Sequence, residues 1–229
     1  MKSTLLNMVS VLAGICLVAS ACVGAVYTIT AEPIAQAKAQ ATVDALSNVL
    51  PEFDNDPSDR VVELTLNDMP IKVYTATLGG EVAGYAVETM TKEGFGGAIR
   101  MMVGFLPSGE VNNVNVLEQA ETPGLGTKMC DEGNPLIESF KGKNPAAMKM
   151  SVTKDGGDVQ ALTAATISSR AYVDAMSRAY AALTEVRGAE ADAGADADAE
   201  ADADADADAA TGATLNESQP TQEGDTENE

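Results

Sequence analysis

Four side chains with hydroxyl groups lie within a stretch of seven residues, just before a segment with a helical pattern. They are Thr163, Thr166, Ser168 and Ser169. The start of a helix carries N–H groups without backbone partners and a partial positive charge, so it is a natural binding site for a phosphate group. Serine and threonine are also the commonest helix caps, and residue types alone favour a cap formed by Ser168 or Ser169.

A second stretch, residues 121–126, reads Glu-Thr-Pro-Gly-Leu-Gly. Pro123 and Gly124 favour a tight turn, and Gly126 permits another group to approach the backbone closely. Spacing alone predicts a surface turn without a ligand. The glycine cluster at residues 94–97 predicts a turn before a strand, because it lacks the glycine spacing and the Gly-Lys-Ser/Thr ending of a phosphate-binding loop.

Composition excludes several kinds of chemistry. The chain has no histidine, which rules out His-based acid–base catalysis, Ser-His-Asp triads and His metal sites. Its three cysteines, Cys16, Cys22 and Cys130, have no Cys-x-x-Cys spacing, which argues against an iron–sulfur cluster or a zinc site. We expect no catalytic residue, no metal ligand and a plain thiol at Cys130. The acidic segment 51–60 is expected to be a solvated loop, since it lacks the ligand order of a calcium-binding EF-hand.

The acidic residues are spread unevenly along the 229-residue chain. The formal net charge is −21, and residues 188–229 carry 14 of the 35 acidic side chains, which alternate with alanine in the first part of this segment. Such a surface argues against nucleic-acid binding, which needs basic patches. With like charges and little to bury, residues 188–229 are predicted to form a disordered, solvated tail. Binding of a basic partner is the alternative role for this tail.

The N-terminal segment is uncharged from Ser3 to Ala31, between Lys2 and Glu32. It is long enough for a transmembrane helix. A cleaved signal peptide or a lipoprotein signal ending at Cys22 are the alternatives, but the apolar run continues past that cysteine. The position of Lys2 places the N-terminus in the cytoplasm and the remainder outside it, in a single-pass protein of the cytoplasmic (inner) membrane.

The remaining pattern predicts one α+β domain. A helix is expected over 33–50 because Pro33 fits a first helical turn. Five segments rich in β-branched and apolar residues predict an antiparallel meander flanked by helices, with strands at 61–66, 71–77, 82–88, 98–105 and 111–117. Further along, we expect a short helix at 134–140, a strand at 148–153, and a helix after Thr166 with an apolar stripe at Tyr172, Met176, Ala179, Tyr180 and Leu183.

Four parts follow from these patterns. We expect a cytoplasmic N-terminus with a transmembrane anchor at 1–31, a linker helix and acidic loop at 32–60, the folded domain at 61–187 and the tail at 188–229.

Three of these stretches resemble one known family. Residues 163–169, Thr-Ala-Ala-Thr-Ile-Ser-Ser, are similar to the S/T-G-A-T motif of the FMN-binding domain found in both Rnf and Nqr electron-transport complexes. The stretch 121–126 matches a second motif of that domain in the expected order, and 94–104 resembles its glycine turn and strand. The resemblance covers roughly residues 60–187. Ala164 stands where the family has glycine, and Gln160 where it has an acidic residue, a role that Asp158 is near enough in sequence to take.

The resemblance implies a flavoprotein that carries electrons within a membrane complex, rather than a stand-alone enzyme. Thr166 would hold FMN through a phosphoester bond made by a flavin transferase, and the other subunits of an ion-translocating complex linking ferredoxin and NAD would be its partners. Arg170 would offset phosphate charge or pair with Asp174. The remaining cofactor-binding residues implied are Thr163, Ser168 and Ser169 for the phosphate and Glu121, Thr122, Leu125 and Gly126 for the flavin.

Two further functions stay open. One is the equivalent FMN carrier of a sodium-pumping NADH:quinone oxidoreductase. The other is a membrane-anchored binding module with no redox role.

Overall fold

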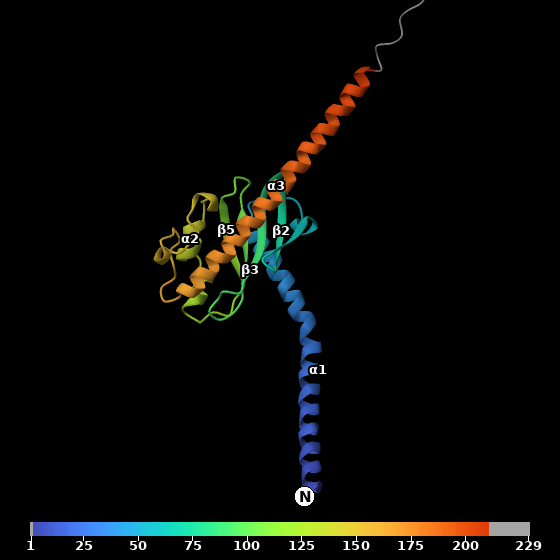
Figure 1. The fold of residues 1–229 in the computed structure, drawn as a ribbon, viewed down its shortest axis with the longest axis vertical. Helices are drawn as coiled ribbons and strands as arrows, with labels where there is room; N and C mark the ends of the chain where they lie inside the picture. The colour runs from blue at the N-terminus through green and yellow to red at the C-terminus, as the bar shows by residue number, and fades with distance from the viewer. Residues whose placement is uncertain (1, 211–229) are drawn as a thin grey trace, which may run out of the picture. The chain divides into compact units, whose positions relative to one another are not determined.

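The computed structural model describes residues 2–210, with the side chains of residues 4–190 (Figure 1). The chain divides into two units, Met1–Thr184 and Glu185–Glu229. The first unit contains the anchor helix, the sheet and the candidate site. The second consists of the last part of helix α3, and residues 211–229 lie outside the described part of the chain.

A five-stranded antiparallel sheet forms the centre of the first unit. Its strand order follows the chain, β1-β2-β3-β4-β5, so the predicted meander and the α+β class are confirmed. Two-residue turns with positive φ join the first three strands, at Asn67-Asp68 and at Gly79-Gly80. Such turns match the twist of an antiparallel hairpin. The strands are β1 (Val61–Leu66), β2 (Met69–Leu78), β3 (Glu81–Thr91), β4 (Ile99–Phe105) and β5 (Val111–Glu118).

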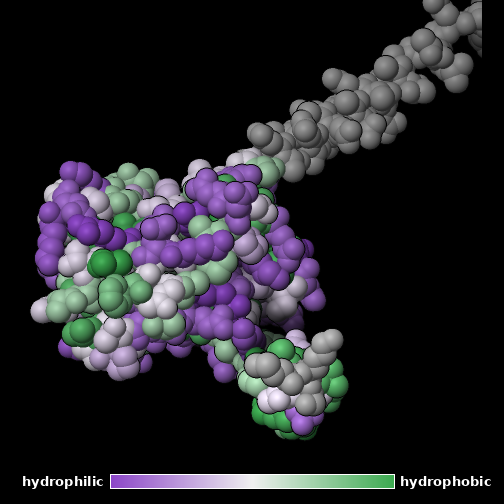
Figure 2. Space-filling view, turned by 60° about the horizontal axis from the view of Figure 1, so that its bottom comes forward, coloured by the Kyte–Doolittle hydropathy of each residue, from purple (hydrophilic) through white to green (hydrophobic). Residues whose placement is uncertain are grey.

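Helix α1 is one continuous helix from Lys2 to Val49, with Pro33 inside it. The sequence analysis instead expected a separate helix beginning at Pro33. Proline removes one backbone hydrogen bond and crowds the carbonyl four residues earlier, but it does not prevent a helix from continuing when the flanking residues favour one. Within the described residues, α1 is the single helix long and apolar enough to cross a membrane. Its apolar residues up to Ile29 are exposed, as the hydrophobic surface in Figure 2 shows. The helix is thus compatible with a single-pass anchor.

The last turns of α1 pack against one face of the sheet. Leu46 and Val49 form a buried cluster with Tyr74, Ala86 and Met102. The contact is close where β4 passes the helix end, because a Cβ at Gly104 would lie 1.9 Å from the carbonyl oxygen of Val49. A glycine is therefore required where helix and strand cross.

The part of helix α3 (Thr166–Ala210) that belongs to the first unit, up to Thr184, covers the opposite face. Phe105 points away from the α1 face, and its ring centroid lies 6.2 Å from that of Tyr180 on α3. The Thr91 hydroxyl donates to Asp174 over 2.7 Å. The predicted apolar stripe is confirmed, since four of its members are buried and Tyr180 is half-buried.

The predicted tail differs at its start. In the structure α3 continues from Gly188 to Ala210, where the sequence analysis expected disorder. The physical reason is the high alanine content of this segment, because alanine has the highest helix propensity of all residues. The disorder expected for residues 211–229 stays a prediction.

The segment between β5 and α3 contains short elements. The predicted helix is present as α2 (Pro135–Phe140), and the Asn134 side chain accepts from the N–H groups of Leu136 and Ile137. The strand predicted at 148–153 was wrong. Its place is taken by one bridge between Val152 and Val159 and a 3-10 turn, η4 (Thr153–Asp155). Backbone hydrogen bonds join this segment to Asp158 and Val159, but the chain turns at η4 directly after Val152, which limits the pairing to one bridge. The Lys149 N–H also donates to the Asp158 carboxylate, at 2.7 Å. The other 3-10 turns are η1 (Pro57–Asp59), η2 (Gly126–Cys130) and η3 (Pro145–Ala147).

Candidate cofactor-binding site

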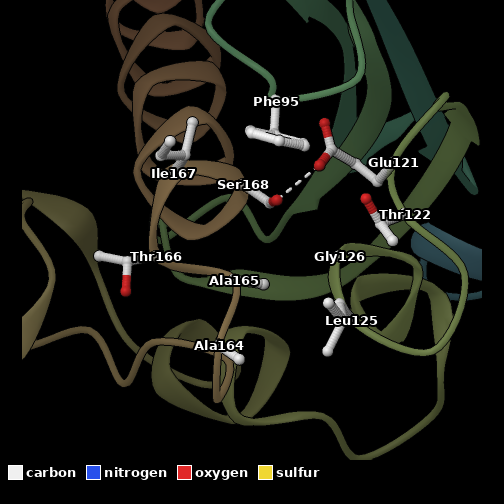
Figure 3. A pocket seen from close by; sticks show the side chains of 10 residues that line it. All are labelled: Phe95, Glu121, Thr122, Leu125, Gly126, Ala164, Ala165, Thr166, Ile167 and Ser168. Atoms are coloured by element: carbon white, nitrogen blue, oxygen red, sulfur yellow. Dashed lines mark hydrogen bonds between the residues drawn. The ribbon is translucent and has the colours of Figure 1, made fainter.

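A pocket of about 330 Å³ lies where the start of α3 meets the 121–126 turn and the glycine turn before β4 (Figure 3). Its volume is at the lower end of the range for ligand pockets, about 300–1,000 Å³. The three segments are far apart in sequence, and all three were singled out by their residue types. The pocket is lined by Phe95, Glu121, Thr122, Leu125, Gly126, Ala164, Ala165, Thr166, Ile167 and Ser168.

The first turn of α3 supplies unpaired donors. The N–H of Ser169 makes the first hydrogen bond of the helix, to the Ala165 carbonyl at 2.9 Å. The N–H groups of Thr166, Ile167 and Ser168 therefore have no partner within the helix. The first turn has no acidic residue. Donors and a positive helix end thus remain available to an anion such as a phosphate.

Glu121 ties the three segments together. Its side chain is 5% exposed, and its two oxygens accept from the Gly96 N–H at 3.0 Å and from the Ser168 hydroxyl at 2.5 Å (Figure 3). Hydrogen bonds to a carboxylate are stronger than those between neutral groups. The buried carboxylate therefore holds the glycine turn and the helix start on either side of the 121–126 turn.

Three glycines make this junction close enough. A Cβ at Gly126 would lie 2.8 Å from the Ser168 hydroxyl oxygen, one at Gly94 would lie 2.7 Å from the Glu121 carboxylate, and one at Gly96 would lie 1.8 Å from the Ala120 carbonyl oxygen. Gly124 has a φ of +76°, as expected for a tight turn. Close backbone approach is thus the physical reason for the glycines in both motifs.

Exposed apolar side chains surround the pocket. Phe95 is 68% exposed and lines the pocket beside the Glu121–Ser168 contact, with Leu125 and Ile167 also exposed (Figure 3). Neither Phe95 nor Ile167 was predicted as a site residue. The signal that could have found Phe95 is its place as a lone aromatic residue within a glycine turn, where no core position explains it.

Thr166 is half-buried and is the first residue of α3. Its hydroxyl oxygen accepts from the ammonium group of Lys154 at 2.9 Å. In Figure 3 its side chain lies on the other side of the helix start from Glu121. Lys154 was not singled out by the sequence analysis, because a lone lysine in a loop carries no pattern.

Arg170 makes a different ion pair from the one considered in the sequence analysis. Its guanidinium group contacts both carboxylate oxygens of Asp155, each at 2.8 Å, which lowers the pKa of Asp155 below its usual value. Asp174 pairs instead with Arg178 at 2.9 Å. The pairing of Arg170 with Asp174 was therefore wrong, because the η4 turn brings a carboxylate closer than the next helical turn does.

The structure brings six of the eight predicted cofactor-binding residues to the pocket. Thr163 is exposed and does not line it, and Ser169 is fully buried. The Ser169 hydroxyl donates to the Ala165 carbonyl and accepts from the Leu162 N–H, both at 2.9 Å. Neither Ser168 nor Ser169 is the N-cap, because the helix begins before them, at Thr166.

Ala164 has the backbone conformation that glycine adopts most readily. Its φ is +60°, and it is one of three non-glycine residues with positive φ within residues 2–210. The tight bend it forms turns the chain into α3. Because L-residues with a Cβ are strained in this region, the bend is held by its surroundings.

Comparison with known proteins assigns the same segments to one family. The FMN-binding domain family matches residues 94–181, a range that contains every residue lining the pocket. The pocket therefore belongs to an FMN-binding domain.

Relatives match over most of the chain. The G subunit of the ion-translocating oxidoreductase complex of Shewanella baltica (strain OS223) is 32% identical over 190 residues, covering 78% of this chain and 89% of the relative. The proteins of the same name from Aliivibrio fischeri (strain MJ11) and Pseudomonas aeruginosa (strain UCBPP-PA14) are 32% and 34% identical. The matches cover 78% and 69% of this chain, and 90% and 78% of the relatives' own lengths. The chain belongs to the family of G subunits of ion-translocating oxidoreductase complexes, known as RnfG.

Proposed function

We propose that this chain is the FMN-carrying electron-transfer subunit of a membrane-bound, ion-translocating oxidoreductase complex of the Rnf type, with FMN bonded through a phosphoester to Thr166. The observation that carries the proposal is the position of Thr166. Its hydroxyl stands at the start of α3, beside N–H groups without helical partners and at the edge of the pocket. The relatives named for an ion-translocating complex support this type over the sodium-pumping quinone reductase.

The residues present fit an FMN group. The N–H groups of Thr166, Ile167 and Ser168 suit the phosphate, whereas the exposed apolar surfaces of Phe95 and Leu125 suit an aromatic ring system. When bound, FMN supplies one- and two-electron redox chemistry, and the protein supplies attachment, orientation and tuning of its potential.

The same proposal includes the cellular setting. Helix α1 would anchor the chain in the cytoplasmic membrane, with its N-terminus inside and the FMN-binding domain outside. A covalent bond would then keep a cofactor that could not easily be replaced there. The partners are the other subunits of the complex and a flavin transferase that makes the bond.

The test is co-expression of the full chain with a flavin transferase, followed by intact mass and in-gel flavin fluorescence after complete denaturation. We expect a mass increase of one FMN less one water, together with fluorescence. Both should be lost in Thr166→Ala. Thr166→Ser keeps a hydroxyl at the same place and should retain some attachment. Thr184→Ala is the matched control, because it removes an exposed threonine of the same helix that does not line the pocket, and it should leave both signals unchanged.

Two outcomes would reject the proposal. Attachment that persists in Thr166→Ala would place the bond on another residue. A wild-type protein that gains no mass and binds no flavin, although the transferase modifies a second substrate in the same cells, would favour a binding module without a redox role.

A further inference from the structure

We propose that Lys154 is the residue that pairs with the flavin phosphate at Thr166 and makes this part of the site select a phosphorylated flavin. The inference rests on the proposed function, because it needs the FMN phosphate to lie at the start of α3. It adds a residue that lies outside both motifs and does not line the pocket.

The geometry supports this role directly. The Lys154 ammonium group lies 2.9 Å from the Thr166 hydroxyl oxygen and donates a hydrogen bond to it. A phosphate group attached to or resting against that oxygen would lie within reach of the same ammonium group. Lysine has three donors, so it can contact the hydroxyl oxygen and phosphate oxygens together.

The charges around the helix start point the same way. Carboxylates are the groups that normally occupy the N-terminal turn of a helix, and a cation there is unfavourable. The first turn of α3 has no acidic side chain, and Lys154 makes no ion pair within the described residues. An ammonium group and a positive helix end therefore face each other, and an anion between them would be attracted by both.

The neighbouring ion pair fixes Lys154 without competing for the anion. Asp155, the next residue, binds the guanidinium group of Arg170 through both oxygens at 2.8 Å. This contact joins the η4 turn to the first turns of α3 and so sets the position of Lys154 beside Thr166. It also engages Arg170 with Asp155, whereas Lys154 makes no ion pair within the described residues and is available to a phosphate.

The first measurement needs no covalent bond. Full-length protein in detergent micelles, expressed without a transferase, is titrated with FMN and with riboflavin, which lacks the phosphate. We expect the wild type to bind FMN more tightly than riboflavin. Lys154 is exposed, so Lys154→Gln should weaken FMN binding about two- to fivefold, the upper range for an exposed ion pair, and leave riboflavin binding unchanged. Lys154→Arg should retain the preference, and raised salt should reduce it.

Lys141→Gln is the matched control. Lys141 is an exposed lysine at the end of α2 that does not line the pocket, and its substitution changes the net charge equally. An equal effect of Lys141→Gln and Lys154→Gln would reduce the result to overall charge and overturn the proposal. So would a wild type that binds the two flavins equally, or a Lys154→Gln variant that loses both to the same extent.

The second measurement separates this proposal from the proposed function. Co-expression with the transferase gives the fraction of protein that carries covalent flavin, and Lys154→Gln should lower it while Lys154→Arg and Lys141→Gln do not. If the wild type preferred FMN to riboflavin, lost this preference in Lys154→Gln and gained no covalent flavin, the phosphoester would be refuted and the role of Lys154 would stand. If the Lys154→Gln variant carried as much covalent flavin as the wild type and still preferred FMN to riboflavin, the role of Lys154 would be refuted, whereas the phosphoester at Thr166 would stand.

Discussion

The contact between Glu121 and Ser168 is the interaction that we expect to hold the pocket together. The two residues are 47 positions apart, the Ser168 hydroxyl donates over 2.5 Å, and both side chains are buried. Ser168→Ala leaves one carboxylate oxygen without its donor. A hydrogen bond to a charged group contributes about 1.5–3 kcal/mol, so we expect Ser168→Ala to lower the free energy of unfolding by about 2 kcal/mol.

Glu121→Gln should have a smaller effect. The amide oxygen of glutamine can still accept from the Gly96 N–H, and the amide nitrogen can donate to the Ser168 hydroxyl, which then accepts. We expect a loss of about 1 kcal/mol, because neutral bonds replace charge-assisted ones. In the double variant the second substitution should have little further effect on this contact, which gives a coupling energy of about 1 kcal/mol.

Urea unfolding of the full chain in micelles, followed by tyrosine fluorescence because the chain has no tryptophan, measures these values. Ser177→Ala is the matched control. It removes a hydroxyl from the same helix that donates only to the Val173 carbonyl, and it should change stability by less than about 0.5 kcal/mol. Additive effects of the two site substitutions, or equal effects of Ser168→Ala and Ser177→Ala, would refute the view that Glu121 joins the segments.

Two other predictions concern single residues. Ala164→Gly should raise the free energy of unfolding by about 1 kcal/mol, because it relieves the positive φ of +60°; a loss of stability in urea unfolding would contradict this. Tyr172→Phe should be neutral or stabilise the protein by up to about 1 kcal/mol in the same assay, because the buried hydroxyl of Tyr172 has no hydrogen-bond partner among the described residues; a destabilisation would show that it has one.

Much of the fold could be predicted from local patterns. The five strands have their expected order, and β1 has its expected bounds, because alternation and turn glycines act over a few residues. The strand expected at 148–153 was wrong because the chain turns at Thr153–Asp155, which limits the pairing of this segment to one bridge between Val152 and Val159. The separate helix predicted to begin at Pro33 was wrong. A proline can begin a helix or lie inside one, and the residues on both sides of it decide which occurs.

The candidate site was predictable in its residues but not in its contacts. Sequence alone indicated both the 121–126 turn and the hydroxyl cluster. Residue types offered Ser168 or Ser169 as a cap and the family resemblance implied a phosphate contact, but neither predicted the bond from Ser168 to Glu121. Sequence alone also missed Lys154, whose only distinction is its distance from Thr166 in the folded chain. Contacts over 12 and 47 residues of sequence depend on how the turns between them fold, and no local periodicity records this.

Ala164 shows why the kind of departure from a motif matters more than its size. Judged by volume, alanine in place of the family's glycine is a small change. The structure shows that the relevant quantity is the backbone angle, since the φ of +60° at Ala164 is the bend that brings Thr166 to the first position of α3. The strain of an alanine there is of the order of 1 kcal/mol, which the buried Glu121–Ser168 contact can offset. We therefore expect the substitution to lower stability and to leave Thr166 at the first position of α3, able to accept the flavin as it would beside a glycine.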